Sequence, residues 1–460
     1  MKTNNILKAI MTIMALSLGI IATSAQTQST FFLDNYSYSY QFNPALMPQK
    51  TFHSFPGLGN ISVDIHSNIG LSSILYPSTD GQGLVTGLNS SVTSETFLSR
   101  LNDINMMGTG VNANLYAYGK RKESKFFNIE LNLKTVASTT LPKEMFSFLK
   151  NGSQDTAYDL SNTSLLANSY LELALGYAHS NKSNTLSYGF RVKGLFGLAS
   201  INANLNGTQA TINGTEVNAN LNGKAMLACP FVSLSSDENG QINDMTLDSK
   251  HISPAGYGGA ADIGINWQPL EGLNISAAVI DLGAIVWNYN ALADANGIAS
   301  FNGLDLGEEN SNAEEEMNKA LEQFKALAKY KLQDGSASLS TMLPFAVNAG
   351  VRYRLPFAHW MKVGVSGRYQ NNLAPNWESR AALTITPASW FSITANYGYG
   401  NYGPICGGAM SISLLCLNLF MGIDGYCGPI GLYNNNIPYP VNEFRYKVNF
   451  GLTLQLGRRY

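Results

Sequence analysis

The sequence predicts an all-β protein: a transmembrane antiparallel β-barrel of about fourteen strands, with an N-terminal plug-like segment and short helices in its loops. Three observations predict it: repeated alternation of apolar and polar residues, an export signal at the start of the chain, and a composition rich in Gly but poor in charge. Only 13% of the 460 residues are charged, and the formal net charge is −2. This balance argues against a nucleic-acid partner, which would call for a basic stripe.

Residues 1–25 have the three-part layout of a secretory signal peptide. Lys2 and Lys8 precede an apolar run, and small residues end the segment at Ala25, where we expect cleavage. The apolar run is shorter than the roughly 18 to 20 residues of a spanning helix, so a membrane anchor is the weaker interpretation. We therefore expect export to a bacterial outer membrane without a helical span.

Residues 26–58 show no clear period and are broken by prolines. We expect this range to form the plug-like segment that enters the lumen of the barrel. Within it, Asn43, Pro44 and Ala45 are expected to form a turn.

Residues 59–460 form a series of alternating runs, as in FNIELNLKTVAST. There Ile129 and Leu131 lie on one side of the predicted strand, and Glu130 and Asn132 lie on the other. Such alternation is typical of antiparallel strands with two different faces. It recurs at residues 61–65, 111–118, 171–178, 186–193, 261–267, 347–354, 361–368, 391–400 and 447–456.

The polar faces of these runs are dominated by Gly, Asn, Ser and Ala, whereas the outer face of a soluble sandwich would be rich in Lys, Glu and Thr. Apolar faces toward lipid and small polar residues toward a lumen are what an outer-membrane barrel needs. Closure also leaves no backbone edge exposed to hydrocarbon. The last strand ends near the aromatic Tyr460, as barrels of this class commonly do.

Three stretches between the runs have helical character: residues 94–101, 142–152 and 314–331. We expect them in loops or in the plug. The similar words INANLNG and VNANLNG, within residues 201–223, predict a polar extended hairpin that projects as a loop.

The alternation places a set of basic residues toward the lumen: Lys134, Arg191, Lys193, Arg352, Arg354, Lys362, Arg368 and Lys447. A basic lumen could guide an anionic solute. The alternative, which we favour, is that these charges pair with carboxylates of the plug, such as Asp34, or lie near lipid headgroups.

The four cysteines lie in an exported chain, where disulfides persist. A hairpin that turns at Cys416 would bring Cys406 and Cys427 face to face, so we predict a bridge between them. The disulfide states of Cys229 and Cys416 are left open. No metal-ligand spacing, cofactor motif or catalytic motif is found, and we predict neither an enzyme nor a cofactor or metal site.

Several stretches resemble a Bacteroidota outer-membrane β-barrel family known as domain of unknown function 5723: FFLDNYSYSYQFNPALMP, SFPGLGNISVDIHSNIGLSSILYP, LPKEMFSFLKNG and NISAAVIDLGAIVW. The turn at Asn43, Pro44 and Ala45 is similar to one in FadL-type barrels and their relatives in type IX secretion. That resemblance implies a fourteen-stranded barrel with an N-terminal plug. It carries over no ligand residues.

Two functions fit these expectations. The first is a monomeric transport or uptake barrel, in contact with outer-membrane lipids, for a small hydrophobic or anionic molecule. An apolar pocket or lateral opening near Asn43 would favour it. The second is a structural or secretion-accessory barrel without a solute, which docks a secretion-system or periplasmic protein partner through its loops. The sequence does not choose between them and names no substrate.

Overall fold

The computed structural model describes most of the chain after the expected signal peptide: residues 27–78, 84–151, 157–205, 209–213, 216–238, 242–247, 253–302, 331–333, 335–371, 376–433, 437–440 and 443–457. The signal peptide, the helix expected up to residue 330 and the terminal Tyr460 lie outside these residues. Lys331, the last residue of that expected helix, begins a strand instead.

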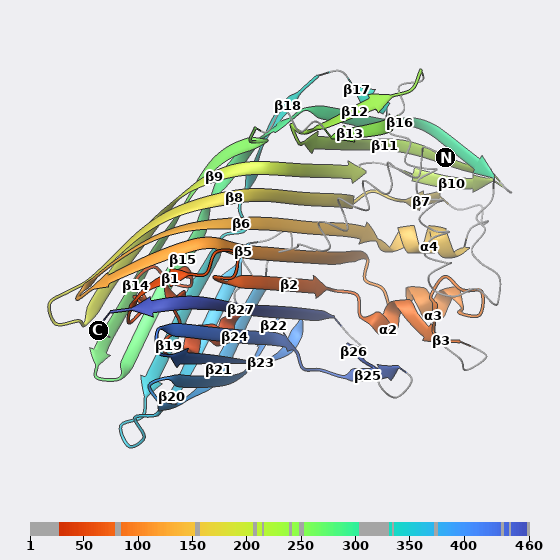
Figure 1. The fold of residues 1–460 in the computed structure, drawn as a ribbon. Helices are drawn as coiled ribbons and strands as arrows, with labels where there is room; N and C mark the ends of the chain where they lie inside the picture. The colour runs from red at the N-terminus through yellow and green to blue at the C-terminus, as the bar shows by residue number, and fades with distance from the viewer. Residues whose placement is uncertain are drawn as a thin grey trace.

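Fourteen antiparallel strands of the described chain close into a barrel, which confirms the predicted fold class (Figure 1). Each strand pairs with its neighbour in sequence order, and the last strand, β27, pairs with the first, β2. The wall strands are β2 (Ile61–Ser67), β5 (Ile104–Lys122), β6 (Lys125–Pro142), β8 (Thr163–Ser180), β9 (Leu186–Leu205), β14 (Gly256–Leu270), β15 (Leu273–Tyr289), β19 (Ala346–Arg354), β20 (Met361–Gln370), β21 (Asn376–Ala388), β22 (Phe391–Gly400), β23 (Gly403–Leu414), β24 (Leu417–Tyr426) and β27 (Phe444–Leu456).

The remaining elements belong to the plug, to short additions to the wall and to the long connections. The helices are η1 (Gln28–Phe32), η2 (Ser39–Gln41), α2 (Leu71–Ile74), α3 (Ser94–Leu98) and α4 (Lys143–Asn151). The strands are β1 (Thr51–Ser54), β3 (Leu75–Pro77), β4 (Leu84–Thr86), β7 (Ala157–Asp159), β10 (Gln209–Asn213), β11 (Glu216–Ala228), β12 (Val232–Ser236), β13 (Ile242–Leu247), β16 (Ala291–Asn302), β17 (Lys331–Gln333), β18 (Ala337–Met342), β25 (Ile430–Tyr433) and β26 (Ile437–Pro440). Helices α3 and α4 lie where the sequence predicted them. No described helix is long and apolar enough to span a membrane.

The barrel is apolar outside and polar inside. Outward side chains such as Val192 and Ile263 are 53% and 66% exposed, whereas the inward Glu130 and Lys134 are 0% and 4% exposed. A soluble protein would place these groups the other way round, because exposed apolar area is unfavourable in water. A bilayer reverses that preference, so this distribution is the one that a spanning barrel requires.

The two ends of the barrel differ. At one end, which we call the turn end, neighbouring strands are joined by short turns, as between β5 and β6. At the other, the loop end, most connections are longer and several carry the helices α2, α3 and α4 (Figure 1), although β22 and β23 are joined there by a tight turn. These helices share a small hydrophobic core that includes Phe97 and Phe148. The stretch at 201–223 is not a separate projection, because β11 pairs with both β9 and β16 and extends the wall at the loop end.

Two local features shape the lumen. Strand β1 pairs with both β27 and β5, so it belongs to the wall, and the lumen segment ends before Thr51 instead of at residue 58. In β15, a bulge places Asp281 in a left-handed conformation with φ of 60°. A bulge adds one residue and so reverses which side chains face inward beyond it. Ile280 is therefore buried before the bulge, and Ile285 and Trp287 are buried after it.

Candidate ligand site in the barrel lumen

The plug, residues 27–50, fills the lumen toward the turn end with a cluster of aromatic rings. Tyr38, Tyr40 and Phe42 are at most 1% exposed. Tyr36 and Tyr38 pack edge-on against Phe420 of β24, with ring centroids 4.9 and 5.7 Å apart. The plug and the wall therefore share a packed aromatic core.

Polar contacts fix the plug to several wall strands. Arg352 Nη1 donates to the carbonyl of Phe31 at 3.1 Å, and Asn348 Nδ2 donates to the carbonyl of Phe42 at 2.8 Å. Lys362 forms an ion pair with Asp34. This pair is the plug contact that the sequence offered as the alternative to a free basic lumen.

A first network of buried ion pairs lies beside the plug and consists of Glu130, Lys134, Glu172, Arg191, Lys193, Asp262 and Asp281. Lys134 Nζ lies 2.7 Å from the carboxylate of Glu172, and Lys193 Nζ lies 2.5 Å from that of Asp281. Arg191 joins two further carboxylates of the network. Buried charges are tolerated when they are paired and hydrogen-bonded in this way.

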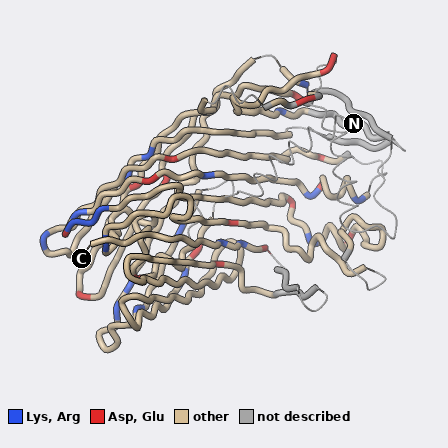
Figure 2. The backbone as a smooth tube through the Cα atoms, in the orientation of Figure 1, with Lys and Arg blue, Asp and Glu red and all other residues tan. Residues whose placement is uncertain are grey.

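A second network lies across the lumen and consists of Asp64, Glu378, Arg380, Asp424, Arg445 and Lys447. Arg380 lies 2.7 Å from Glu378 and 2.9 Å from Asp424. Lys447 Nζ lies 2.8 Å from the other oxygen of Glu378. Figure 2 shows how acidic and basic positions share the same wall strands.

Most of the predicted lumen residues do face inward. Lys134, Arg191, Lys193, Arg368 and Lys447 are buried. The exception is Arg354, which is exposed at the end of β19, where the strand leaves the wall. The inward cations are mostly balanced by carboxylates, although Arg368 Nε has no hydrogen-bond partner among the described residues. A strongly basic lumen is therefore not what these residues form.

The sequence interpretation missed several members of these networks. Asp64, Glu378 and Arg445 follow the inward parity of their strands and could have been found by extending it. Asp281 could not, because the bulge itself turns its carboxylate inward.

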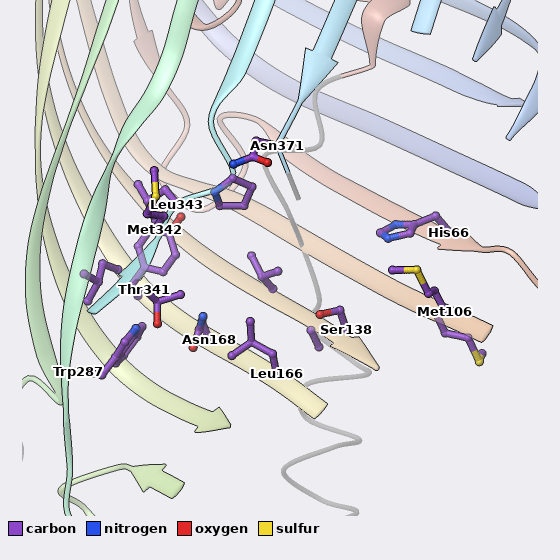
Figure 3. A pocket seen from close by; sticks show the side chains of 16 residues that line it. His66, Met106, Ser138, Leu166, Asn168, Trp287, Thr341, Met342, Leu343 and Asn371 are labelled. Carbon is purple, nitrogen blue, oxygen red and sulfur yellow. The ribbon is translucent and has the colours of Figure 1, made fainter. Parts of the chain in front are cut away.

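Above the networks, toward the loop end, the inward face becomes apolar and encloses a cavity of about 230 Å³ (Figure 3). On three of these strands the change occurs within a few residues, from Lys134 to Val136, from Glu172 to Tyr170 and from Asp281 to Ile285. We call this cavity the loop-end pocket. It is lined by His66, Met106, Met107, Val136, Ala137, Ser138, Leu166, Asn168, Tyr170, Ile285, Trp287, Thr341, Met342, Leu343, Pro344 and Asn371.

The turn at Asn43 and Pro44 contacts the wall at glycines of β9 and β14, which carry no side chain. Asn43 Nδ2 donates to the carbonyls of Ile265 and Ala277, at 2.8 and 3.1 Å. A Cβ on Gly264 would lie 2.0 Å from Asn43 Oδ1, and one on Gly189 would lie 2.4 Å from the backbone of Pro44. On the outer side of the same wall residues is an apolar groove of about 470 Å³, lined by Gly189, Phe190, Gly264, Ile265, Ala277 and Val347 among others.

The four cysteines are free thiols in the structure. The hairpin turns at Leu415 and Cys416, so Cys406 pairs with Gly425 and not with Cys427. The face-to-face geometry expected from the sequence was therefore wrong by two residues, although the Cys406 and Cys427 side chains still interact. A bridge between them stays a prediction. Among the described residues, no group of three His, Cys, Asp or Glu is arranged to hold a metal ion.

Comparison with known proteins places the chain in a family. Residues 44–424 match the family described as "Family of unknown function (DUF5723)". The protein belongs to this family. That membership confirms the family resemblance predicted from the sequence, whereas kinship with type IX secretion barrels and a Bacteroidota origin stay predictions. No curated protein matches the chain.

Two solved structures with a partly similar course of the chain are toluene transporters. The toluene transporter TbuX of Ralstonia pickettii is 9% identical, with 94% of this chain and 99% of that chain covered and a TM-score of 0.47. The toluene transporter TodX of P. putida is 8% identical, with 96% and 98% covered and a TM-score of 0.44. Likeness at this level assigns no substrate to this protein.

Proposed function

We propose that this protein is an outer-membrane barrel that takes up a small hydrophobic molecule through the loop-end pocket. The observation that carries the proposal is the apolar lining of that pocket, with Met106, Leu166 and Ile285 on the inward face of the wall above the two ion-pair networks. Concave pockets lined by apolar side chains with a few polar groups are the usual form of small-molecule sites.

The connections at the two ends support an orientation for uptake. In bacterial outer-membrane barrels, short turns face the periplasm and longer loops face the outside. With this orientation the loop-end pocket is offered to the exterior, and the plug stands between the pocket and the periplasm.

A lateral exit through the barrel wall suits a hydrophobic molecule better than a straight passage along the lumen. The aromatic plug and the two ion-pair networks fill the lumen below the pocket, so a straight passage to the periplasm would have to displace both of them. The groove over Gly189 and Gly264 offers an apolar surface where only glycine backbone separates the plug turn from the outer face. Because Arg191 and Asp262 lie between the pocket and these glycines along β9 and β14, we propose that this ion pair moves aside and that the molecule then leaves the lumen there, into the bilayer.

The charge balance favours a hydrophobic molecule over an anionic one. Most of the inward cations have a carboxylate partner within ion-pair distance, as Lys134 and Lys193 do. Such cations offer little attraction to a passing anion, because their field is largely cancelled at short range.

The test measures binding of radiolabelled naphthalene to the purified barrel and its uptake by cells that produce the barrel. Val136→Trp fills the pocket and should lower binding and uptake at least about tenfold, which corresponds to 1.4 kcal/mol. Val365→Trp is the matched control, because Val365 is 53% exposed on the lipid face and its variant should behave as wild type.

A third variant, Ala277→Trp, fills the outer groove and should keep binding while lowering uptake. Equal binding by wild type and Val136→Trp would reject the pocket as the site. If wild type binds no naphthalene and crosslinking recovers a stoichiometric protein partner, the secretion-accessory function replaces this proposal.

A further inference from the structure

The loop-end pocket contains hydrogen-bond donors that no described residue satisfies. Trp287 is 0% exposed, and its Nε1 has no hydrogen-bond partner among the described residues. Ser138 Oγ is also buried without a described partner. Buried polar groups are nearly always paired, so an orphan group points to water or to a ligand.

Asn168 offers a further nitrogen donor, its side-chain amide, in the same pocket. Its Oδ1 accepts a hydrogen bond from Ser200 Oγ at 2.7 Å, which fixes the oxygen side of the amide toward Ser200. The Nδ2 group is left with no hydrogen bond to the part of the chain that the structure describes. Figure 3 shows Asn168 and Trp287 on the same side of the pocket.

The indole of Trp287 is held with its nitrogen away from the wall. A Cβ on Gly197 would lie 2.4 Å from Cζ3 and 2.9 Å from Cε3 of the ring, so the benzene edge of the indole presses on Gly197 of β9. The Nε1 atom lies on the opposite edge of the ring system. Gly197 is thus required for this placement, because any side chain there would displace the ring.

The pocket has no charged group to match an ionised ligand. None of its described lining residues is Lys, Arg, Asp or Glu, and His66 has its Nδ1 3.6 Å from the buried Asp64. An ionised ligand would therefore lose its hydration without gaining a counter-charge.

Resting on the proposed function, we propose that the loop-end pocket selects neutral apolar molecules that carry one hydrogen-bond acceptor oxygen, such as a carbonyl or a hydroxyl. The oxygen accepts from Trp287 Nε1 and Asn168 Nδ2, and the apolar body lies against Met106, Val136 and Leu166. A site built to donate hydrogen bonds binds an analogue that cannot accept them more weakly, because its donors are then left unpaired.

The experiment compares toluene with benzaldehyde, which has a similar apolar body and adds one carbonyl oxygen. Binding to the purified barrel is measured by calorimetry, with Val136→Trp as the blank for partition into detergent. Trp287→Phe keeps an aromatic ring and removes the donor. This variant should weaken the binding of benzaldehyde about tenfold or more, which is the loss expected for one unmade hydrogen bond in a buried site. The affinity for toluene should stay unchanged.

Trp267→Phe is the matched control, because Trp267 is 50% exposed on the outer face and its variant should bind both molecules as wild type does. Asn168→Leu should weaken benzaldehyde alone, as Trp287→Phe does. If both molecules bind and neither pocket variant separates them, water satisfies the donors and this inference is overturned. If neither molecule binds to the wild-type barrel, the proposed function itself fails.

Discussion

The interior of the barrel is filled differently toward its two ends. Toward the turn end, the plug and the ion-pair networks leave little space, and most of the charged side chains there form ion pairs, although single atoms such as Arg368 Nε and Asn348 Oδ1 have no hydrogen-bond partner among the described residues. Toward the loop end, apolar side chains line an open cavity, and Trp287 Nε1 and Ser138 Oγ have no described partner. From this contrast we expect stability to depend mainly on the half of the lumen toward the turn end, which we call the lower half, and ligand recognition, as proposed above, on the half toward the loop end, the upper half.

Removing a cation from the lower half should have the largest effect on stability. Arg191→Met leaves the buried carboxylates of Glu130 and Asp262 without their guanidinium partner. Breaking a buried pair in this way costs about 3–5 kcal/mol of the free energy of unfolding. Urea unfolding in lipid vesicles, followed by tryptophan fluorescence, measures the change.

Arg354→Met provides the control for Arg191, since Arg354 is exposed at the end of β19. This variant should change the free energy of unfolding by no more than about 0.5 kcal/mol, as most surface substitutions do. Equal losses for the two variants would show that the lower network is not a source of stability.

A smaller loss is expected from the aromatic core of the plug. Phe420→Ala removes a fully buried ring that packs against Tyr36 and Tyr38. The cost should be about 3 kcal/mol, the lower end of the range for such truncations, because the plug can partly collapse into the space. The same unfolding assay measures the change. If Phe420→Ala loses less free energy of unfolding than the pocket variant Leu166→Ala, the lower half is not tightly packed.

The smallest loss is expected in the upper half. Leu166→Ala enlarges a pocket that is already hollow, so it creates little new cavity surface. We expect about 1 kcal/mol or less, because the side chain is only partly buried and few contacts are lost. If this variant is as unstable as Phe420→Ala, the loop-end pocket is part of the packed core and the contrast between the halves fails.

Much of the barrel could be predicted because each wall strand carries its own signal. The alternation at Glu130, Asn132 and Lys134 gave the correct inward face, and so did Arg191 and Lys193. The end of the plug was harder to predict from the sequence, because β1 is a four-residue strand whose pairing with β27 depends on residues at the far end of the chain. The predicted pairing of Cys406 with Cys427 was wrong for a local reason: the turn lies one residue earlier than expected, and this moves the partner of Cys406 by two residues, to Gly425.

The sequence by itself determined that apolar and polar faces alternate along many strands, and this follows from the two-residue period of an extended chain. Only the tertiary structure decided which side chains meet across the lumen. An unbroken alternation from Ala278 and Ile280 would have sent Trp287 toward lipid, whereas the bulge at Asp281 turns it inward. That single extra residue brings an indole donor and an apolar wall together, because a bulge reverses the facing of every residue that follows it.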